Sequence, residues 1–150
     1  MMNYQKETGV RGSSLRSTNT IFIVEEDSST RSMLIESILQ ESSYYPVLLT
    51  DGFQALKLTM HIKPSLFLID YYLPKMNGIE LYDHLHEREE LRDVPAIIID
   101  ACLNDHRQAI EKRGLVAISK PFDVNELLTT IHEVLARVPE RTAWYHQAGL

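Results

Sequence analysis

Five short hydrophobic runs recur along the chain, with longer and more polar segments between them. The runs are TIFIV, YYPVLL, LFLI, AIII and VAIS, at residues 20–24, 44–49, 66–69, 96–99 and 116–119. They are too short for helices, and all but the second are rich in β-branched or aromatic residues. Because their apolar residues follow one another without alternation, the runs predict strands buried on both faces of a sheet.

The segments between the runs have the spacing of helices. In the clearest, the last one, apolar residues return every three or four positions and end before a proline. Asp123 is predicted to cap this helix, with Glu126 in a variant of the capping box. Ser28 or Ser29 is predicted to cap the first helix. We predict helices over residues 28–42, 52–62, 78–91, 105–113 and 124–138.

Strands and helices therefore alternate along the chain, five of each. This order predicts the α/β class, in which right-handed crossovers place helices on both faces of a parallel five-stranded sheet, a three-layer sandwich. Residues 20–138 are predicted to form this single domain. We expect the polar residues 1–19 to be a disordered lead and residues 139–150 to be a tail too short to fold alone.

The composition narrows the classes of function. The chain has 150 residues, 44% of them hydrophobic, which suits one domain with its own core. Its formal net charge of −6 gives no basic excess for binding nucleic acid. A single cysteine excludes an intramolecular disulfide. No apolar run approaches the roughly 18 residues of a membrane span, and the N-terminus lacks the apolar centre of a signal peptide. We therefore expect a cytoplasmic protein.

Charged residues stand where four of the predicted strands end. They are Glu25–Asp27, Asp70, Asp100 and Lys120. Because the carboxyl ends of parallel strands meet at one edge of the sheet, and open α/β sheets bind ligands there, we expect these side chains to converge. The sequence thus predicts a cluster of carboxylates with one ammonium group.

Such a cluster points to a particular chemistry. Crowded carboxylates repel one another and need a cation or protons to coexist. Oxygen ligands favour Mg²⁺, which takes one or two carboxylates and keeps several waters. A strand-end carboxylate beside Mg²⁺ and a lysine is a known arrangement for phosphoryl transfer, in which the carboxylate can be the nucleophile. We therefore predict phosphoryl chemistry with Mg²⁺ as the cofactor.

Four motifs, taken together in order and spacing, resemble the receiver domain of bacterial two-component response regulators of the chemotaxis type. They are IFIVEEDSSTR, LFLIDYYLPKMNGIEL, VPAIIIDA and ISKPF, within about residues 20–138. The resemblance implies a flavodoxin-like (βα)5 fold with strand order 2-1-3-4-5. It also implies a stand-alone receiver that accepts a phosphoryl group from a sensor histidine kinase or phosphotransfer protein. Output would then come through protein contacts, on a face from about Asn104 to Arg137.

The resemblance also implies roles for individual residues. Asp70 matches the phosphate-accepting aspartate, and Lys120 matches the lysine that pairs with the phosphoryl group. Glu25 and Glu26 match the acidic pair that holds Mg²⁺. The backbone carbonyl of Tyr72 matches the third protein ligand, so the implied metal site comprises these groups together with Asp70. Beyond transfer to itself and hydrolysis of the product, the family is not enzymatic.

Two more positions match the family and three depart from it. Gly78 matches the glycine that closes the loop after the acceptor, and the Lys120–Pro121 bond is expected to be cis. Glu26 stands where the family nearly always has Asp. Asp100 stands at the switch position that holds Thr or Ser, and an ionised carboxylate cannot donate a hydrogen bond to a phosphoryl oxygen. Ala117 stands at the other switch position, which usually holds an aromatic residue.

These departures leave two hypotheses. Either Asp70 is phosphorylated and the receiver signals through a different movement, or the chain is a degenerate receiver that acts as an interaction or scaffold module without phosphorylation. In the second hypothesis, Asp100 and Lys120 form a standing ion pair. Two other classes are weaker. The acidic loop EEDSST disfavours a flavodoxin-like cofactor binder, and SKPF fits a metal-dependent phosphatase poorly.

Several remaining residues carry weaker signals. Cys102 is expected to be a packed or incidental cysteine, because nothing near it lowers its pKa. His84 and His86 are expected at the surface, since residues two apart on a helix face different ways. The dipeptide Tyr71–Tyr72 is a candidate for exposure at the mouth of the site. The dipeptide Trp144–Tyr145 is a candidate for docking a partner or a second copy, and equally for folding back on the domain.

Overall fold

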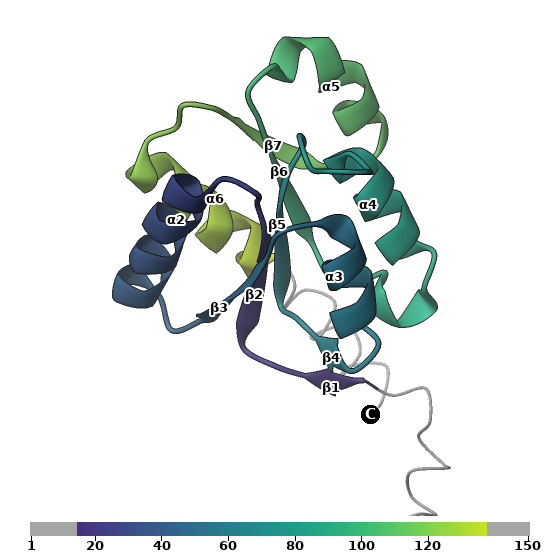
Figure 1. The fold of residues 1–150 in the computed structure, drawn as a ribbon. Helices are drawn as coiled ribbons and strands as arrows, with labels where there is room; N and C mark the ends of the chain where they lie inside the picture. The colour runs from purple at the N-terminus through teal and green to yellow at the C-terminus, as the bar shows by residue number, and fades with distance from the viewer. Residues whose placement is uncertain (1–14, 138–150) are drawn as a thin grey trace, which may run out of the picture.

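The centre of the molecule is a parallel sheet of five strands (Figure 1). The computed structural model describes residues 15–137. The strands are β2 (Thr20–Val24), β3 (Tyr45–Leu49), β5 (Leu66–Asp70), β6 (Ala96–Asp100) and β7 (Val116–Ser119). Their order in the sheet is β3-β2-β5-β6-β7. Counted along the chain this is 2-1-3-4-5, so the predicted flavodoxin-like α/β fold is confirmed.

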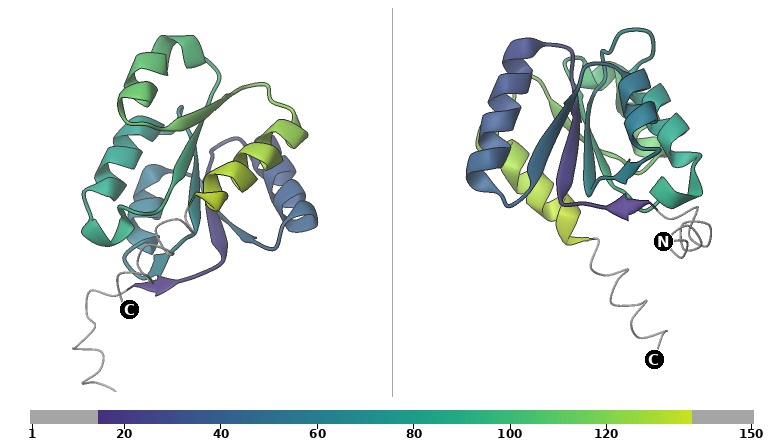
Figure 2. Two further views of the ribbon diagram at one scale, coloured as in Figure 1. Left: turned by 180° about the vertical axis from the view of Figure 1, so that it is seen from behind. Right: turned by 60° about the horizontal axis from the view of Figure 1, so that its bottom comes forward.

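Helices cover both faces of the sheet. Figures 1 and 2 show α2 and α6 on one face and α3, α4 and α5 on the other. Their bounds are α2 Ser28–Glu41, α3 Gly52–Leu58, α4 Gly78–His86, α5 Leu103–Lys112 and α6 Val124–Ala136, with a 3₁₀ turn η1 at Glu89–Leu91. None of the helices in residues 15–137 is long and apolar enough to cross a bilayer.

Successive residues of the strands pack into two separate hydrophobic cores, except in the edge strand β3. The run that forms β3 was predicted to be buried on both faces, but Tyr45 is 67% and Leu48 is 38% exposed. On β2, Phe22 and Val24 pack on the side of α3, α4 and α5, whereas Ile21 and Ile23 pack on the side of α2 and α6. All four side chains are fully buried. Side chains alternate across a strand, so a continuous apolar run is what a sheet with two covered faces requires. This burial fixes the register that brings the strand ends together.

Helix boundaries and caps differ from the predictions in several places. Helix α4, predicted over residues 78–91, ends at His86, and α5, predicted from residue 105, begins at Leu103. Asp27 caps α2, not Ser28 or Ser29, because its Oδ2 accepts from the Thr30 backbone N–H at 2.8 Å. The helix predicted over residues 52–62 ends at Leu58, because residues 62–63 form a strand instead. Asp123 caps α6 as predicted, accepting from the N–H two residues later.

A small second sheet joins the residues before β2 to the segment after α3. Strand β1 (Arg16–Ser17) pairs with β4 (Ile62–Lys63). Residues 16–17 were expected to belong to the lead, and this pairing instead anchors them against the domain. Residues 1–14 of the lead and residues 138–150, including Trp144 and Tyr145, lie outside the described residues.

Candidate functional site

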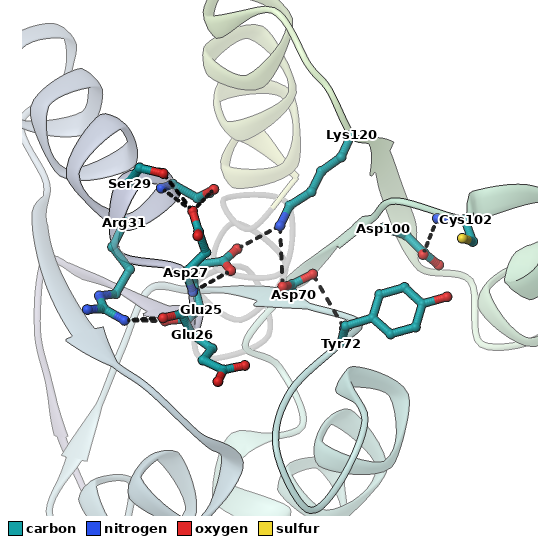
Figure 3. Close-up of polar contacts among 11 residues, drawn as sticks. Glu25, Glu26, Asp27, Ser29, Arg31, Asp70, Tyr72, Asp100, Cys102 and Lys120 are labelled. Atoms are coloured by element: carbon teal, nitrogen blue, oxygen red, sulfur yellow. Dashed lines mark hydrogen bonds and ion pairs between the residues drawn. The ribbon is translucent and has the colours of Figure 1, made fainter.

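Three of the predicted side chains meet at the carboxyl edge of the sheet. Glu25 follows β2, Asp70 ends β5 and Lys120 follows β7. The Lys120 Nζ lies 3.2 Å from Glu25 Oε1 and 3.3 Å from Asp70 Oδ2 (Figure 3). The carboxylates of Glu25 and Asp70 are both buried, at 2% and 5% exposure. A single ammonium group therefore pairs with two carboxylates that water reaches poorly.

This crowding changes the protonation of the three groups. Burial raises the pKa of Asp70, and the adjacent Glu25 carboxylate raises it further, to about 7, although Lys120 works against both. Burial lowers the pKa of the Lys120 ammonium, but the charges of Asp70 and Glu25 outweigh it, and the pKa ends above its ordinary value. Near neutral pH Asp70 therefore exchanges a proton readily, whereas Lys120 stays charged.

An open cavity of about 440 Å³ lies over these groups. Glu26 is on its rim, is exposed, and turns its carboxylate away from Asp70 and Lys120 in Figure 3. Asp27 also faces the cavity, but its carboxylate is held by the hydroxyls of Ser29 and Thr30, both at 2.8 Å. Only Glu25 of the EED run thus joins the buried carboxylate of Asp70.

The donor set fits Mg²⁺. Two carboxylates lie side by side with too little positive charge near them, and the Tyr72 backbone follows Asp70 by two residues on the cavity wall. Within residues 15–137, no three His, Cys, Asp or Glu side chains gather as a metal-binding group. Mg²⁺ needs no such group, since one or two carboxylates and a carbonyl suffice when waters fill the other positions.

The loop after Asp70 is held tightly against the strand it leaves. The Tyr72 N–H donates to Asp70 Oδ1 at 3.4 Å, and the Gly78 N–H donates to the Tyr71 carbonyl at 2.8 Å. A Cβ on Gly78 would lie 2.5 Å from the Asp70 carbonyl oxygen, so no larger residue fits there. The Lys120–Pro121 bond is cis, as predicted.

Asp100 does not pair with Lys120, which corrects the ion pair expected for a degenerate receiver. Its Oδ2 lies 2.6 Å from His106 Nδ1, and its Oδ1 accepts from the Cys102 N–H at 2.8 Å. The carboxylate is fully buried and points away from Asp70 (Figure 3). Ala117, at the other predicted switch position, packs beside the core on the α3, α4 and α5 side.

Sequence reasoning missed His106. It is on α5, six residues after Asp100, and its ring stacks on Tyr71 with centroids 3.7 Å apart. The signal was present in principle: a carboxylate predicted at a buried strand end needs donors, and the next helix offers one histidine within reach.

Other side chains agree with the expectations only in part. Cys102 is exposed, so of its two expected roles, packed or incidental, the packed one is wrong. His86 is half-buried against Tyr82, whereas His84 is exposed as expected. Tyr72 is 47% exposed at the cavity, and Tyr71 is covered by the His106 ring.

Comparison with known proteins agrees with this geometry. The model of the response regulator receiver domain family matches residues 21–132. The polar-differentiation response regulator DivK of Brucella ovis is 32% identical over 120 residues, covering 79% of this chain and 97% of the relative. DivK of Brucella anthropi is 30% identical over 115 residues, covering 75% of this chain and 94% of the relative.

Solved structures share the fold. The receiver domain of sensor histidine kinase PA1611 from Pseudomonas aeruginosa PAO1, with magnesium in its active site cleft, has a TM-score of 0.69 and 24% identity, covering 82% of this chain and 99% of that one. A CheY-like receiver from Methanospirillum hungatei JF-1 has a TM-score of 0.74 and 22% identity, covering 85% and 99%. With the family match, the sheet order and the strand-end cluster in place, the chain belongs to the response regulator receiver domains.

Proposed function

We propose that this receiver accepts a phosphoryl group on Asp70 from a phosphohistidine of a sensor histidine kinase or phosphotransfer protein. One observation carries the proposal: Lys120 Nζ bridges the buried carboxylates of Asp70 and Glu25, at 3.3 and 3.2 Å, beneath an open cavity of about 440 Å³. A nucleophile, a fixed cation and room for a tetrahedral group are therefore in one place.

In the proposed transfer, an ionised Asp70 oxygen attacks phosphorus and forms an O–P bond. The P–N bond of the donor breaks, and its electron pair stays on the imidazole nitrogen, which takes up a proton. Lys120 lies where its ammonium group can pair with a phosphoryl oxygen once it leaves Asp70 Oδ2. Mg²⁺, held by Glu25, Asp70 and the Tyr72 carbonyl with Glu26 at the rim, would supply positive charge against the phosphoryl oxygens.

The output is proposed to be contact with another protein. The DivK relatives consist almost wholly of this domain, since the match covers 97% of the length of the Brucella ovis protein. The proposed contact face runs from about residue 104 to residue 137, over α5, β7 and α6. We place the exchange in the cytoplasm as part of the same proposal.

A second candidate is a degenerate receiver that binds partners without phosphorylation. Two observations favour this candidate. Both carboxylate oxygens of Asp100 contact groups of the same chain, and the Glu26 side chain points away from Asp70. Both observations concern residues around Asp70. Asp70 itself and Lys120 lie where the proposed phosphoryl transfer needs them. We therefore rank it below the phosphorylated receiver.

The deciding experiment is the intact mass of the protein after incubation with Mg²⁺ and acetyl phosphate. We expect one phosphoryl adduct that hydroxylamine removes, as an acyl phosphate requires. Asp70→Asn should give none, and Asp105→Asn, at an exposed carboxylate on α5, should behave as wild type. Absence of the adduct in the wild type would establish the degenerate receiver instead.

A further inference from the structure

Both oxygens of the Asp100 carboxylate are bound by groups of the same chain. The carboxylate is fully buried, and its two oxygens contact the Cys102 N–H at 2.8 Å and His106 Nδ1 at 2.6 Å. A buried carboxylate with both oxygens matched is a fixed anchor. What Asp100 anchors is the imidazole of His106, on the second turn of α5.

The anchored imidazole in turn covers the loop after Asp70. Its ring lies nearly parallel to that of Tyr71, with 3.7 Å between centroids and 12° between planes. The Tyr72 ring meets it edge-on at 5.8 Å, and the two tyrosine rings meet at 4.9 Å. Stacked and edge-to-face contacts of this kind favour one arrangement of the rings. We call these three rings the Tyr71–Tyr72–His106 cluster.

The backbone of the same two tyrosines is hydrogen-bonded to Asp70 and to the neighbouring strand β6. The Tyr71 N–H donates to the Ile99 carbonyl at 2.8 Å, and the Tyr72 N–H donates to Asp70 Oδ1 at 3.4 Å. The Tyr72 carbonyl is the backbone group proposed to hold Mg²⁺. A continuous path of contacts therefore runs from Asp70 through the cluster to His106, Asp100 and the start of α5.

We propose that His106 is the positioning residue that couples the Asp70 loop to α5, with Asp100 holding its imidazole. An Asp–His–Tyr arrangement thus takes the place of the hydroxyl and aromatic pair that Asp100 and Ala117 cannot form. That His106 fixes the loop rests on the structure alone; that phosphorylation moves it rests on the proposed function. Coupling is reciprocal, so a change at either end shifts the other.

The first test uses the metal-free protein. His106→Asn keeps a donor near Nδ1 for Asp100 but removes the ring, and His106→Phe keeps a ring but removes the donor. In His106→Asn we expect amides of residues 71–77 to exchange hydrogen about fivefold faster, as loss of one aromatic stack implies. His132→Asn, at an exposed histidine of α6, is the control and should not change them. Unchanged exchange in His106→Asn would overturn the positioning role.

A second variant separates the effect of the His106 ring from the effect of its contact with Asp100. His106→Phe should restore slow exchange in residues 71–77 while it exposes the amide of Cys102, because Asp100 has lost one partner. If both variants loosen the loop equally, the ring stack is not what holds it, and the proposal fails.

The second test follows the imidazole itself. With uniformly ¹⁵N-labelled protein, addition of Mg²⁺ and beryllium fluoride should move the His106 ring signals and the α5 amides in the wild type. In His106→Asn the Asp70 loop amides should still move, whereas those of α5 should not. If α5 responds equally in both proteins, His106 does not carry the coupling. If wild-type protein also forms no acyl phosphate, the proposed function fails, and the exchange result still decides the positioning role.

Discussion

Asp70 and Asp100 are the same residue type at the ends of neighbouring strands, and both are buried. They differ in the donors around them. Asp100 has two donors for two oxygens, one from its own turn and one from α5. Asp70 also has two, but the Tyr72 N–H lies 3.4 Å from its Oδ1, and the ammonium group of Lys120 at its Oδ2 is shared with Glu25. The pKa of Asp70 is raised to about 7 by burial and by that second carboxylate. Burial alone therefore does not decide what a strand-end carboxylate does; the closeness of its donors and the presence of a second carboxylate that shares them also matter.

The region around Asp70 needs a bound cation or proton, whereas the region around Asp100 does not. The Asp70 side is open to a cavity and short of positive charge, which a cation or a proton can supply. The Asp100 carboxylate is fully buried, and both its oxygens have partners within the chain. The four predictions that follow test this difference, beginning with the largest expected effect.

Lys120→Gln should slow formation of the Asp70 adduct by about 10²–10³-fold, the usual effect of removing one group that stabilises transition-state charge. The rate is measured by intact mass over time with acetyl phosphate and Mg²⁺. Lys112→Gln, at an exposed lysine on α5, is the matched control. A rate within about tenfold of the wild type would show that Lys120 is only a counter-ion.

Stability should respond in opposite directions to the two aspartates. Asp100→Ala leaves the Cys102 N–H and His106 without their buried partner and should cost about 2–4 kcal/mol of unfolding free energy. Asp70→Asn removes a carboxylate whose charge its surroundings disfavour. It should stabilise the metal-free protein by about 1 kcal/mol above neutral pH, after allowance for solvent screening.

Urea unfolding with a chelator present measures both changes in stability. If both substitutions destabilise the protein by similar amounts, the proposed difference between Asp70 and Asp100 is wrong.

Proton binding at Asp70 should control metal affinity. Its folded pKa of about 7 lies above the ordinary value of 3.8, so the folded state holds this proton more tightly than the unfolded state. The metal-free protein should therefore lose stability as pH rises from about 4 to 7. Mg²⁺ must displace the proton, so its affinity should fall up to about tenfold per pH unit below 7.

Calorimetric titration with Mg²⁺ between about pH 5.5 and 8.5 measures the effect of pH on metal affinity. In Asp70→Asn, urea unfolding should show a flatter slope of stability against pH between about 4 and 7. A flat affinity profile in the wild type would mean that Asp70 is already ionised there.

The architecture and the acceptor side were accessible from the sequence. Continuous apolar runs such as residues 66–69 are what a sheet covered on both faces needs, and this fixed both the strands and their ends. Asp70 and Lys120 then follow from topology, because parallel strands deliver their last residues to one edge. The motifs added the roles, which the geometry of the cluster supports.

The switch side was not accessible in the same way. Whether Asp100 turns toward Lys120 or toward α5 depends on side-chain rotamers and on where α5 begins, neither of which periodicity reports. The end of α3 at Leu58 depends on the pairing of β4 with β1, a contact between residues 46 positions apart. The sequence does not show which of Glu25 and Glu26 contacts Lys120, because that depends on the direction in which the backbone points each side chain.

That last difference gives the smallest expected effect. Glu25 is 2% exposed and contacts Lys120, so Glu25→Gln should lower Mg²⁺ affinity more than about tenfold. Glu26 is exposed and turned away from Asp70 in Figure 3, so water and salt screen its charge. Glu26→Gln should therefore change the affinity by less than about threefold.

Calorimetric titration of the two glutamine variants with Mg²⁺, side by side, tests the pair. Glu26→Asp gives the sharper variant, because it keeps the charge and restores the residue type usual in the family. A rise in affinity of about tenfold or more would mean that Glu26 turns inward when the metal binds, and that the run of acidic residues after β2 acts as a pair after all.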